Sequence, residues 1–181
     1  MEAMAVVTRV FEFDAAHRVM NERVKCYNLH GHRFRLEVSF GISPKFYDLG
    51  YPIDFKELKR VFGAYIDEFL DHACIVNPKD REVIDLCTRN KWKLWVMGHG
   101  ANVDRNPSAE NLAEEIFTVF MELARLSPEE FDVRSVKLYE TPNCWVQVSE
   151  TQNYLDVGVK NALFIWRDKR GTFEYDSRRC Q

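Results

Sequence analysis

Several features are missing from this 181-residue sequence, and each absence narrows the class of protein. No stretch approaches the ~18 consecutive apolar residues of a membrane span. The first residues lack the charged region and apolar run of a secretory signal. With 25 basic and 28 acidic side chains, the net charge is -3, without the basic excess of a nucleic-acid binder. We therefore expect a cytoplasmic protein that binds neither membranes nor nucleic acid.

The cysteines also lack a pattern, since they are odd in number and show no paired spacing. In a reducing compartment such cysteines are free thiols rather than a disulfide framework. A hydrophobic content of 46% and this length suit one domain with a sizeable core. We expect a single domain over residues 1–181, with its core at 6–151.

The residues that are present alternate in patterns typical of strands and helices. Residues 6–14 and 32–41 alternate between apolar and polar and predict two strands. Apolar residues at helical spacing follow Asp54 and predict one helix, for which Asp54 can serve as the N-cap. A second such run follows Asn106-Pro107, where Asn106 can cap the helix and Pro107 suits its first position. Residues 133–140 and 144–150 predict two further strands. The order β-β-α-α-β-β indicates an α+β domain, with an antiparallel sheet covered on one face by two helices.

Two segments fall outside this unit. Residues 80–105 form an insertion between the helices, with an aromatic and apolar patch around Trp92 and Trp95 and a glycine-flanked His99. The tail, residues 152–181, contains a predicted hairpin that turns at residues 169–171.

Three histidines form a candidate metal site. His30 and His32 are two residues apart, so on a strand both point to the same face. His17, on the preceding strand, can lie opposite them in an antiparallel pair. Three neutral imidazoles leave a fourth position open, which is the catalytic arrangement of zinc, and three nitrogens in near-tetrahedral geometry suit zinc best.

Three other motifs each allow more than one interpretation. Cys26 could be a fourth zinc ligand, an acid or base beside the metal, or a small buried apolar residue. Asp71-His72 could be a helix end with a favourable cation, or a carboxylate that fixes the tautomer of a histidine. Glu140 could be an exposed edge carboxylate, or the acceptor of two N–H groups from a planar heterocycle.

Six segments together resemble the 6-pyruvoyltetrahydropterin synthase / 6-carboxytetrahydropterin synthase family. They occur in the family's order and are residues 13–17, 26–32, 52–55 with Leu58 and Lys59, 70–72, 107–113 and 136–141. The resemblance implies the T-fold, a β-β-α-α-β-β unit. It also implies trimers that stack into a homohexamer with sites between subunits, and 7,8-dihydroneopterin triphosphate as the substrate.

The resemblance further implies a role for each matching residue. Zinc would bind the hydroxylated side chain of the substrate and acidify it. Cys26 matches the family's acid/base thiol, which is not a zinc ligand. Asp71 and His72 match a proton-relaying dyad contributed by a neighbouring subunit. The residues that match the pterin pocket are Glu140, which anchors the ring, with Thr141, Ser108 and Ala109.

The spacing between Cys26 and His30 distinguishes two branches of the family. Three intervening residues resemble the bacterial carboxy-forming branch, which makes 6-carboxytetrahydropterin, acetaldehyde and triphosphate early in the synthesis of queuosine and other 7-deazaguanines. The alternatives are a pyruvoyl-forming triphosphate lyase, a side-chain-cleaving aldolase, or a catalytically silent zinc-binding scaffold. The joint presence of the thiol, the dyad and Glu140 argues against the scaffold.

The sequence also departs from the family pattern. The insertion and the tail have no counterpart in the family core, and Trp145 and Gln147 stand near the positions of a small residue and a tyrosine. Arg18, Arg23 and Lys25 lie near the metal loop and could meet the triphosphate, or they could be a solvated basic loop.

Overall fold

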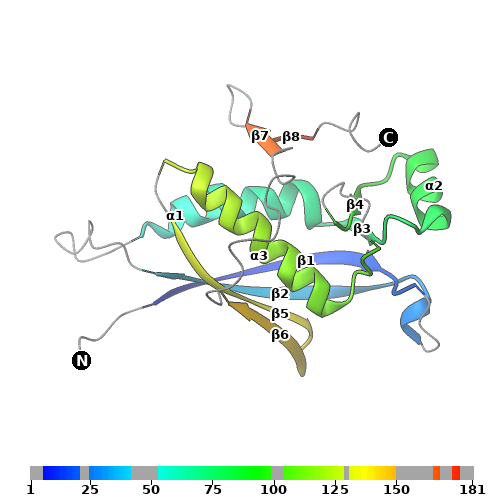
Figure 1. The fold of residues 1–181 in the computed structure, drawn as a ribbon, viewed down its shortest axis with the longest axis horizontal. Coiled ribbons are helices and arrows are strands. Elements are labelled where there is room, and N and C mark those ends of the chain that lie inside the picture. Colours follow the sequence, from blue (N-terminus) through cyan, green and yellow to red (C-terminus); the bar gives the residue numbers. More distant parts are fainter. Residues whose placement is uncertain are drawn as a thin grey trace.

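A mixed six-stranded sheet carries helices α1 and α3 on one face (Figure 1). The computed structural model describes residues 6–20, 25–41, 53–98, 104–128 and 131–149, and the backbone of two short strands at 165–167 and 173–175. The strand order is β4-β3-β1-β2-β5-β6. The strands are β1 (Val7–His17), β2 (His30–Gly41), β3 (Ala73–Val76), β4 (Leu94–Val96), β5 (Asp132–Thr141) and β6 (Cys144–Ser149). The α+β class predicted from the sequence is confirmed.

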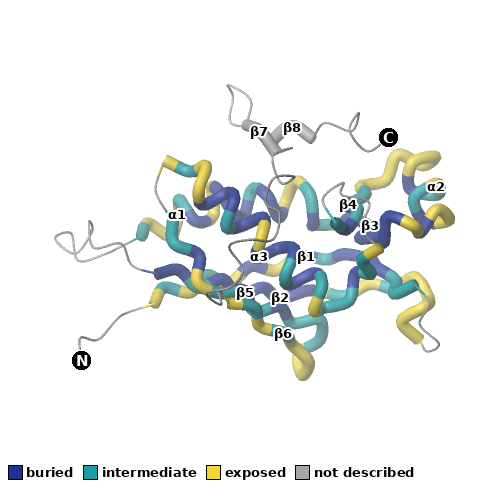
Figure 2. Tube along the Cα trace, in the orientation of Figure 1, coloured by how far each residue is buried: buried dark blue, intermediate teal, exposed yellow. Residues whose placement is uncertain are grey.

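Strand alternation places the core between the sheet and the helices (Figure 2). In β1, Phe11, Phe13 and Ala15 are buried, while the residues between them face the other side of the sheet. In β2, the even-numbered residues from Phe34 to Phe40 are fully buried. Because β1 and β2 pair antiparallel over their whole length, both apolar rows face α3 (Ala109–Leu126) and the first helix.

The segment between the helices departs from the predicted antiparallel sheet. Strands β3 and β4 join it in parallel, β3 beside β1 and β4 beside β3. His72 adopts a left-handed backbone conformation (φ 61°) and donates its N–H to the Asp14 carbonyl at 2.6 Å, which aligns the chain with β1. The strands have four and three residues, too few for a periodic signal.

The insertion also supplies a third helix, α2 (Arg81–Asn90), which the prediction of two helices did not include. Its buried residues Val83 and Cys87 form a small separate cluster with Val76 of β3. The neighbouring Ile75 belongs instead to the main core. Since adjacent strand residues face opposite sides, α2 packs on the sheet face opposite to α1 and α3.

Both predicted helices are present, but one begins differently. Residues 55–70 are continuously helical and comprise α1 (Phe55–Leu58), η3 (Lys59–Gly63) and η4 (Ile66–Leu70), the last two in π geometry, with Asp54 as N-cap as predicted. The N-cap of α3 is Ser108, whose hydroxyl accepts from the Asn111 N–H, so the prediction of Asn106 as cap was wrong. Asn106 instead bonds to Met20, 86 residues earlier in the sequence.

The predicted hairpin of the tail is confirmed in its strands. β7 (Ile165–Arg167) and β8 (Phe173–Tyr175) pair antiparallel. The predicted turn at 169–171, and His99 of the insertion, lie outside the described residues. Among the described residues no helix is both long and apolar enough to cross a membrane.

Candidate metal centre

The antiparallel register of β1 and β2 brings the three predicted histidine ligands together. His17 is the cross-strand partner of His30, and His32 is the partner of Ala15. Each of the three offers one ligand atom, and these atoms lie within 4.8 Å of one another. The ring centroids are 4.7 Å apart for His17 and His30 and 4.9 Å apart for His30 and His32. The cluster can therefore hold a metal ion.

Main-chain carbonyls orient two of the imidazoles. The Pro107 carbonyl lies 2.7 Å from Nδ1 of His17, and the Asn28 carbonyl lies 2.7 Å from Nδ1 of His30. A carbonyl can only accept, so each Nδ1 carries the hydrogen and each Nε2 carries a lone pair. Metal-binding histidines are held in this way in proteins generally.

The electrostatics around His17 favour a cation in the cluster. Its side chain is 1% exposed, and burial lowers the pKa of His17, although the bond to Pro107 and the charge of Glu140 oppose the shift. The buried Nε2 has no hydrogen-bond partner among the residues that the structure describes, and Oε1 of Glu140 lies 3.4 Å from it. Without a proton, that contact sets a lone pair against a carboxylate. A metal ion would bind the lone pair of Nε2 and offset the negative charge of the nearby carboxylate, so the residues fit a metal.

A β-bulge places Glu140 beside the histidines. Tyr139 pairs with Trp145 and Thr141 pairs with Cys144, which leaves Glu140 without a partner on β6. A bulge of this kind bends a strand locally and redirects a side chain. The half-buried Glu140 carboxylate thus lies next to His17, and its neighbour Thr141 lies at the same end of the sheet.

Cys26 lies outside the histidine cluster, on the loop between β1 and β2. It is exposed and belongs to a single 3-10 turn, η1 (Lys25–Tyr27). Its carbonyl accepts from the Val19 N–H at 2.8 Å, which ties the turn to the end of β1. Its sulfur is not part of the cluster of ligand atoms. The exposure of Cys26 contradicts its interpretation as a small buried apolar residue, and its absence from the cluster counts against the ligand interpretation.

The Asp71-His72 dyad forms at the end of the first helix. Nδ1 of His72 lies 2.7 Å from Oδ2 of Asp71, whose Oδ1 accepts from the Asp14 N–H at 2.9 Å. The pKa of Asp71 is lowered: desolvation opposes the shift, but the bonds from Asp14 and His72 outweigh it. The His72 side chain is 75% exposed. The carboxylate therefore fixes the imidazole while the ring stays open to solvent.

The dyad lies beside a cavity that one member of the histidine cluster, His32, also lines. The residues that line this cavity of about 450 Å³ with His72 and His32 include Asp14, Ala16 and Arg33. On β1, Asp14 and Ala16 alternate with the core-facing residues. Neither His17 nor Cys26 lines the cavity.

The remaining predicted pocket residues lie at the start of α3. Ser108 uses its hydroxyl as the N-cap, and Ala109 is the first residue of the helix. Both directly follow Pro107, whose carbonyl holds His17. Ser108 and Ala109 are therefore the two residues that follow Pro107, and Pro107 orients His17.

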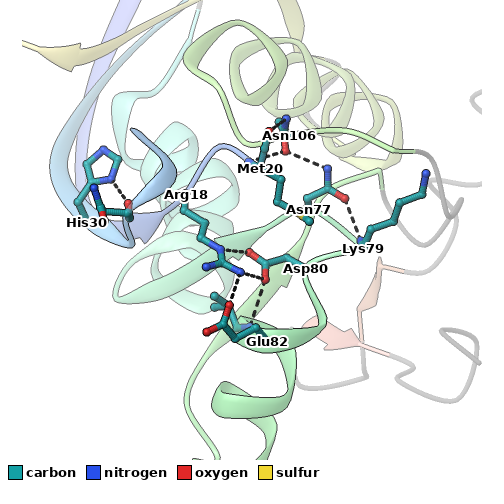
Figure 3. Close-up of polar contacts among 10 residues, drawn as sticks. Arg18, Met20, His30, Asn77, Lys79, Asp80, Glu82 and Asn106 are labelled. Atoms are coloured by element: carbon teal, nitrogen blue, oxygen red, sulfur yellow. Dashed lines mark hydrogen bonds and ion pairs between the residues drawn. The ribbon is translucent and has the colours of Figure 1, made fainter. Parts of the chain in front are cut away.

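Arg18, considered for the triphosphate, is instead committed to two carboxylates (Figure 3). It forms a bidentate pair with Asp80, with contacts of 2.5 and 2.6 Å, and reaches Glu82 at 3.0 Å. The hydrogen bonds that Arg18 donates to Asp80 raise the pKa of Arg18 above its ordinary value. Arg23 lies outside the described residues, and Lys25 lies on η1. Arg18 thereby joins the chain after His17 to the start of α2.

We expect Asp80→Asn to destabilise the fold by about 3 kcal/mol, the low end of the range for breaking a buried ion pair. The Asp80 side chain is 0% exposed, and its loss leaves the Arg18 charge with Glu82 alone. Asparagine can still cap α2. Denaturant unfolding at fixed protein concentration measures the effect.

Glu82→Gln is the matched control for this prediction. Glu82 is 79% exposed, so its loss should cost less than about 1 kcal/mol. Equal effects of the two substitutions would contradict a buried anchoring role for Asp80.

The main-chain carbonyls and Asn106 are the site features that sequence analysis did not identify. Main-chain groups carry no residue signature, and the partners of His17 and Asn106 lie 90 and 86 residues away in the sequence. To predict these contacts, one would need to know which residues of β1 lie beside the start of α3, and the sequence alone does not show this.

Comparison with known proteins agrees with this geometry. Residues 6–151 match the family described as 6-pyruvoyl tetrahydropterin synthase. The 6-carboxy-5,6,7,8-tetrahydropterin synthase of Rickettsia felis is 40% identical over 149 residues, covering 80% of this chain and 100% of the relative. The enzyme of the same name from Haemophilus influenzae is 30% identical over 155 residues, covering 81% and 100%. The chain therefore belongs to the 6-pyruvoyl tetrahydropterin synthase family, and the predicted lyase class is confirmed.

Solved structures share the fold at lower identity. A protein of Wolinella succinogenes described as uncharacterized gives a TM-score of 0.64 at 20% identity, covering 83% of this chain and 100% of the other. The 6-pyruvoyl tetrahydropterin synthase of Caenorhabditis elegans gives 0.54 at 20% identity, covering 82% and 97%. At this identity the likeness concerns the fold alone.

Proposed function

We propose that the protein is a zinc-dependent lyase that converts 7,8-dihydroneopterin triphosphate to 6-carboxy-5,6,7,8-tetrahydropterin, acetaldehyde and triphosphate. The observation that carries the proposal is the cluster of His17, His30 and His32, with the unpartnered, buried Nε2 of His17 and the nearby Glu140 carboxylate. When bound by three histidines, zinc supplies a Lewis acid that makes hydroxyl groups of the substrate side chain more acidic.

Different side chains would then bind the substrate and transfer protons. Glu140 accepts N–H groups from the pterin ring, and its position beside His17 would set the side chain of the substrate at the metal. Thr141, Ser108 and Ala109 line the ring pocket. Cys26 acts as acid or base on the substrate, from a loop tied to β1.

We propose that Asp71 and His72 complete the site of a neighbouring copy. His72 is 75% exposed and lies beside a cavity that Asp14, Arg33 and His32 line, whereas His17, His30 and Cys26 do not line it. A dyad in this position is better placed to serve another subunit. This supports a homo-oligomer with sites at its interfaces, as a trimer stacking to a hexamer.

Two observations favour the carboxy-forming reaction over the pyruvoyl-forming one. Relatives at 30% identity or above over their full length are named 6-carboxy-5,6,7,8-tetrahydropterin synthases. Three residues separate Cys26 from His30. The product would serve the synthesis of queuosine or other 7-deazaguanines.

Mass spectrometry of the products formed from 7,8-dihydroneopterin triphosphate tests the proposal. We expect a carboxypterin and acetaldehyde from the zinc-loaded protein. A pyruvoyl product without acetaldehyde would overturn the carboxy assignment in favour of the triphosphate lyase. Bound zinc with no product would indicate a silent zinc-binding scaffold.

A further inference from the structure

Asn106 ties three separate segments of the chain together (Figure 3). Its Oδ1 accepts from the Met20 N–H at 3.0 Å and from Nδ2 of Asn77 at 2.9 Å. Its Nδ2 donates to the Met20 carbonyl at 2.9 Å. Because a main-chain carbonyl only accepts, the orientation of the amide is determined. The side chain satisfies both main-chain groups of Met20, as a neighbouring strand would.

The two ends of this clamp lie next to the two halves of the site. Met20 follows His17 by three residues, and its neighbour Val19 donates to the carbonyl of Cys26 at 2.8 Å. On the other side, Asn106 directly precedes Pro107, whose carbonyl accepts from Nδ1 of His17 at 2.7 Å. One amide therefore lies between the segment that orients a metal ligand and the loop that carries the thiol.

The clamp is itself held in place. Asn77, 1% exposed, donates from Nδ2 to both Asn106 and Asp104, and its Oδ1 accepts from the Lys79 N–H at 2.8 Å. The Asn106 carbonyl accepts from Nδ2 of Asn111 on α3 at 2.9 Å. Few alternative positions are open to the Asn106 side chain.

We propose that Asn106 is a positioning residue for the lyase reaction, which sets the His17 imidazole and the Cys26 loop relative to each other. The inference rests on the proposed function. In this role Asn106 would act through Pro107 and Met20 rather than by contact with the substrate or the metal. The residues that orient metal ligands typically contribute about 10- to 100-fold in metal affinity or activity.

The isosteric substitution Asn106→Asp tests this role. It replaces the amide donor by an oxygen that faces the Met20 carbonyl, so the clamp opens without a change in volume. We expect zinc affinity to fall about tenfold and the absorption bands of the Co²⁺-substituted protein to change. At saturating zinc, kcat should stay about tenfold low, while KM changes little because Glu140 is unaffected.

Asn90→Asp is the matched control. Asn90 also donates from its amide to a main-chain carbonyl, that of Leu86 in the exposed part of α2. Zinc titration against a chromophoric chelator, Co²⁺ spectra and kinetics are measured on the full chain. Wild-type affinity, spectrum and kcat in Asn106→Asp would overturn the proposal, even if the variant is less stable. A wild-type protein that binds no zinc would instead count against the proposed function.

Asn77→Ala provides a second test if Asn106→Asp does not fold. It removes the support of the clamp and leaves Asn106 itself in place. We expect the same changes in zinc affinity and Co²⁺ spectrum, at smaller amplitude. Wild-type values for Asn77→Ala, in that case, would overturn the positioning role.

Discussion

Replacing His32 with alanine should remove both the metal and the activity. Two imidazoles would remain, His17 and His30, and two neutral ligands do not make the three-ligand site that catalytic zinc requires. Lewis-acid stabilisation is worth several kcal/mol, so turnover should fall by at least about a thousandfold. Elemental analysis of the purified protein and the product assay measure the two effects.

His72→Ala is the matched control for this substitution. It also removes one imidazole, but His72 is 75% exposed and does not belong to the group of histidines that could hold a metal ion. This variant should keep its full metal content while losing turnover, because it removes the proposed proton relay. A full complement of zinc in His32→Ala would refute the ligand assignment.

Replacing Cys26 with alanine should leave the metal in place and remove turnover. The Cys26 sulfur is not among the clustered ligand atoms, so the metal keeps all three histidines. Acid or base catalysis by a positioned side chain contributes about 100- to 10,000-fold, and we expect a loss in kcat of that size. Zinc content and kcat are measured on the same preparation.

Cys144→Ala provides the comparison for the thiol. Cys144 is an exposed free cysteine at the start of β6, and its removal should leave both zinc content and kcat unchanged. If zinc is lost in Cys26→Ala but not in Cys144→Ala, Cys26 is a ligand. The site would then be closed and structural, and the proposed mechanism would fail.

The histidine cluster could be predicted because strand geometry is local. Side chains two residues apart on a strand point to the same face of the sheet. His30 and His32 therefore lie on one face regardless of the rest of the chain. The apolar rows of β1 and β2 then determine the register, since a slip by one residue would turn Phe34 and Leu36 to solvent. That register is what brings His17 opposite His30.

The inter-helix segment could not be predicted in the same way. β3 and β4 are too short to show a period, and their parallel pairing depends on where the first helix ends. Asn106 and Ser108 are both good N-cap residues, so local propensity does not choose between them. The Asn106 side chain hydrogen-bonds to the main chain of Met20, and Ser108 caps α3 instead.

By itself the sequence determined the two central strands, the two long helices and the identity of the clustered histidines, because each depends on short-range periodicity. Only the tertiary structure decided which nitrogen of His17 faces the cluster, that a bulge places Glu140 beside it, and that His72 lines a cavity with Asp14 and Arg33. These features depend on main-chain carbonyls and on contacts between distant segments. A linear pattern of residue types does not encode such contacts directly.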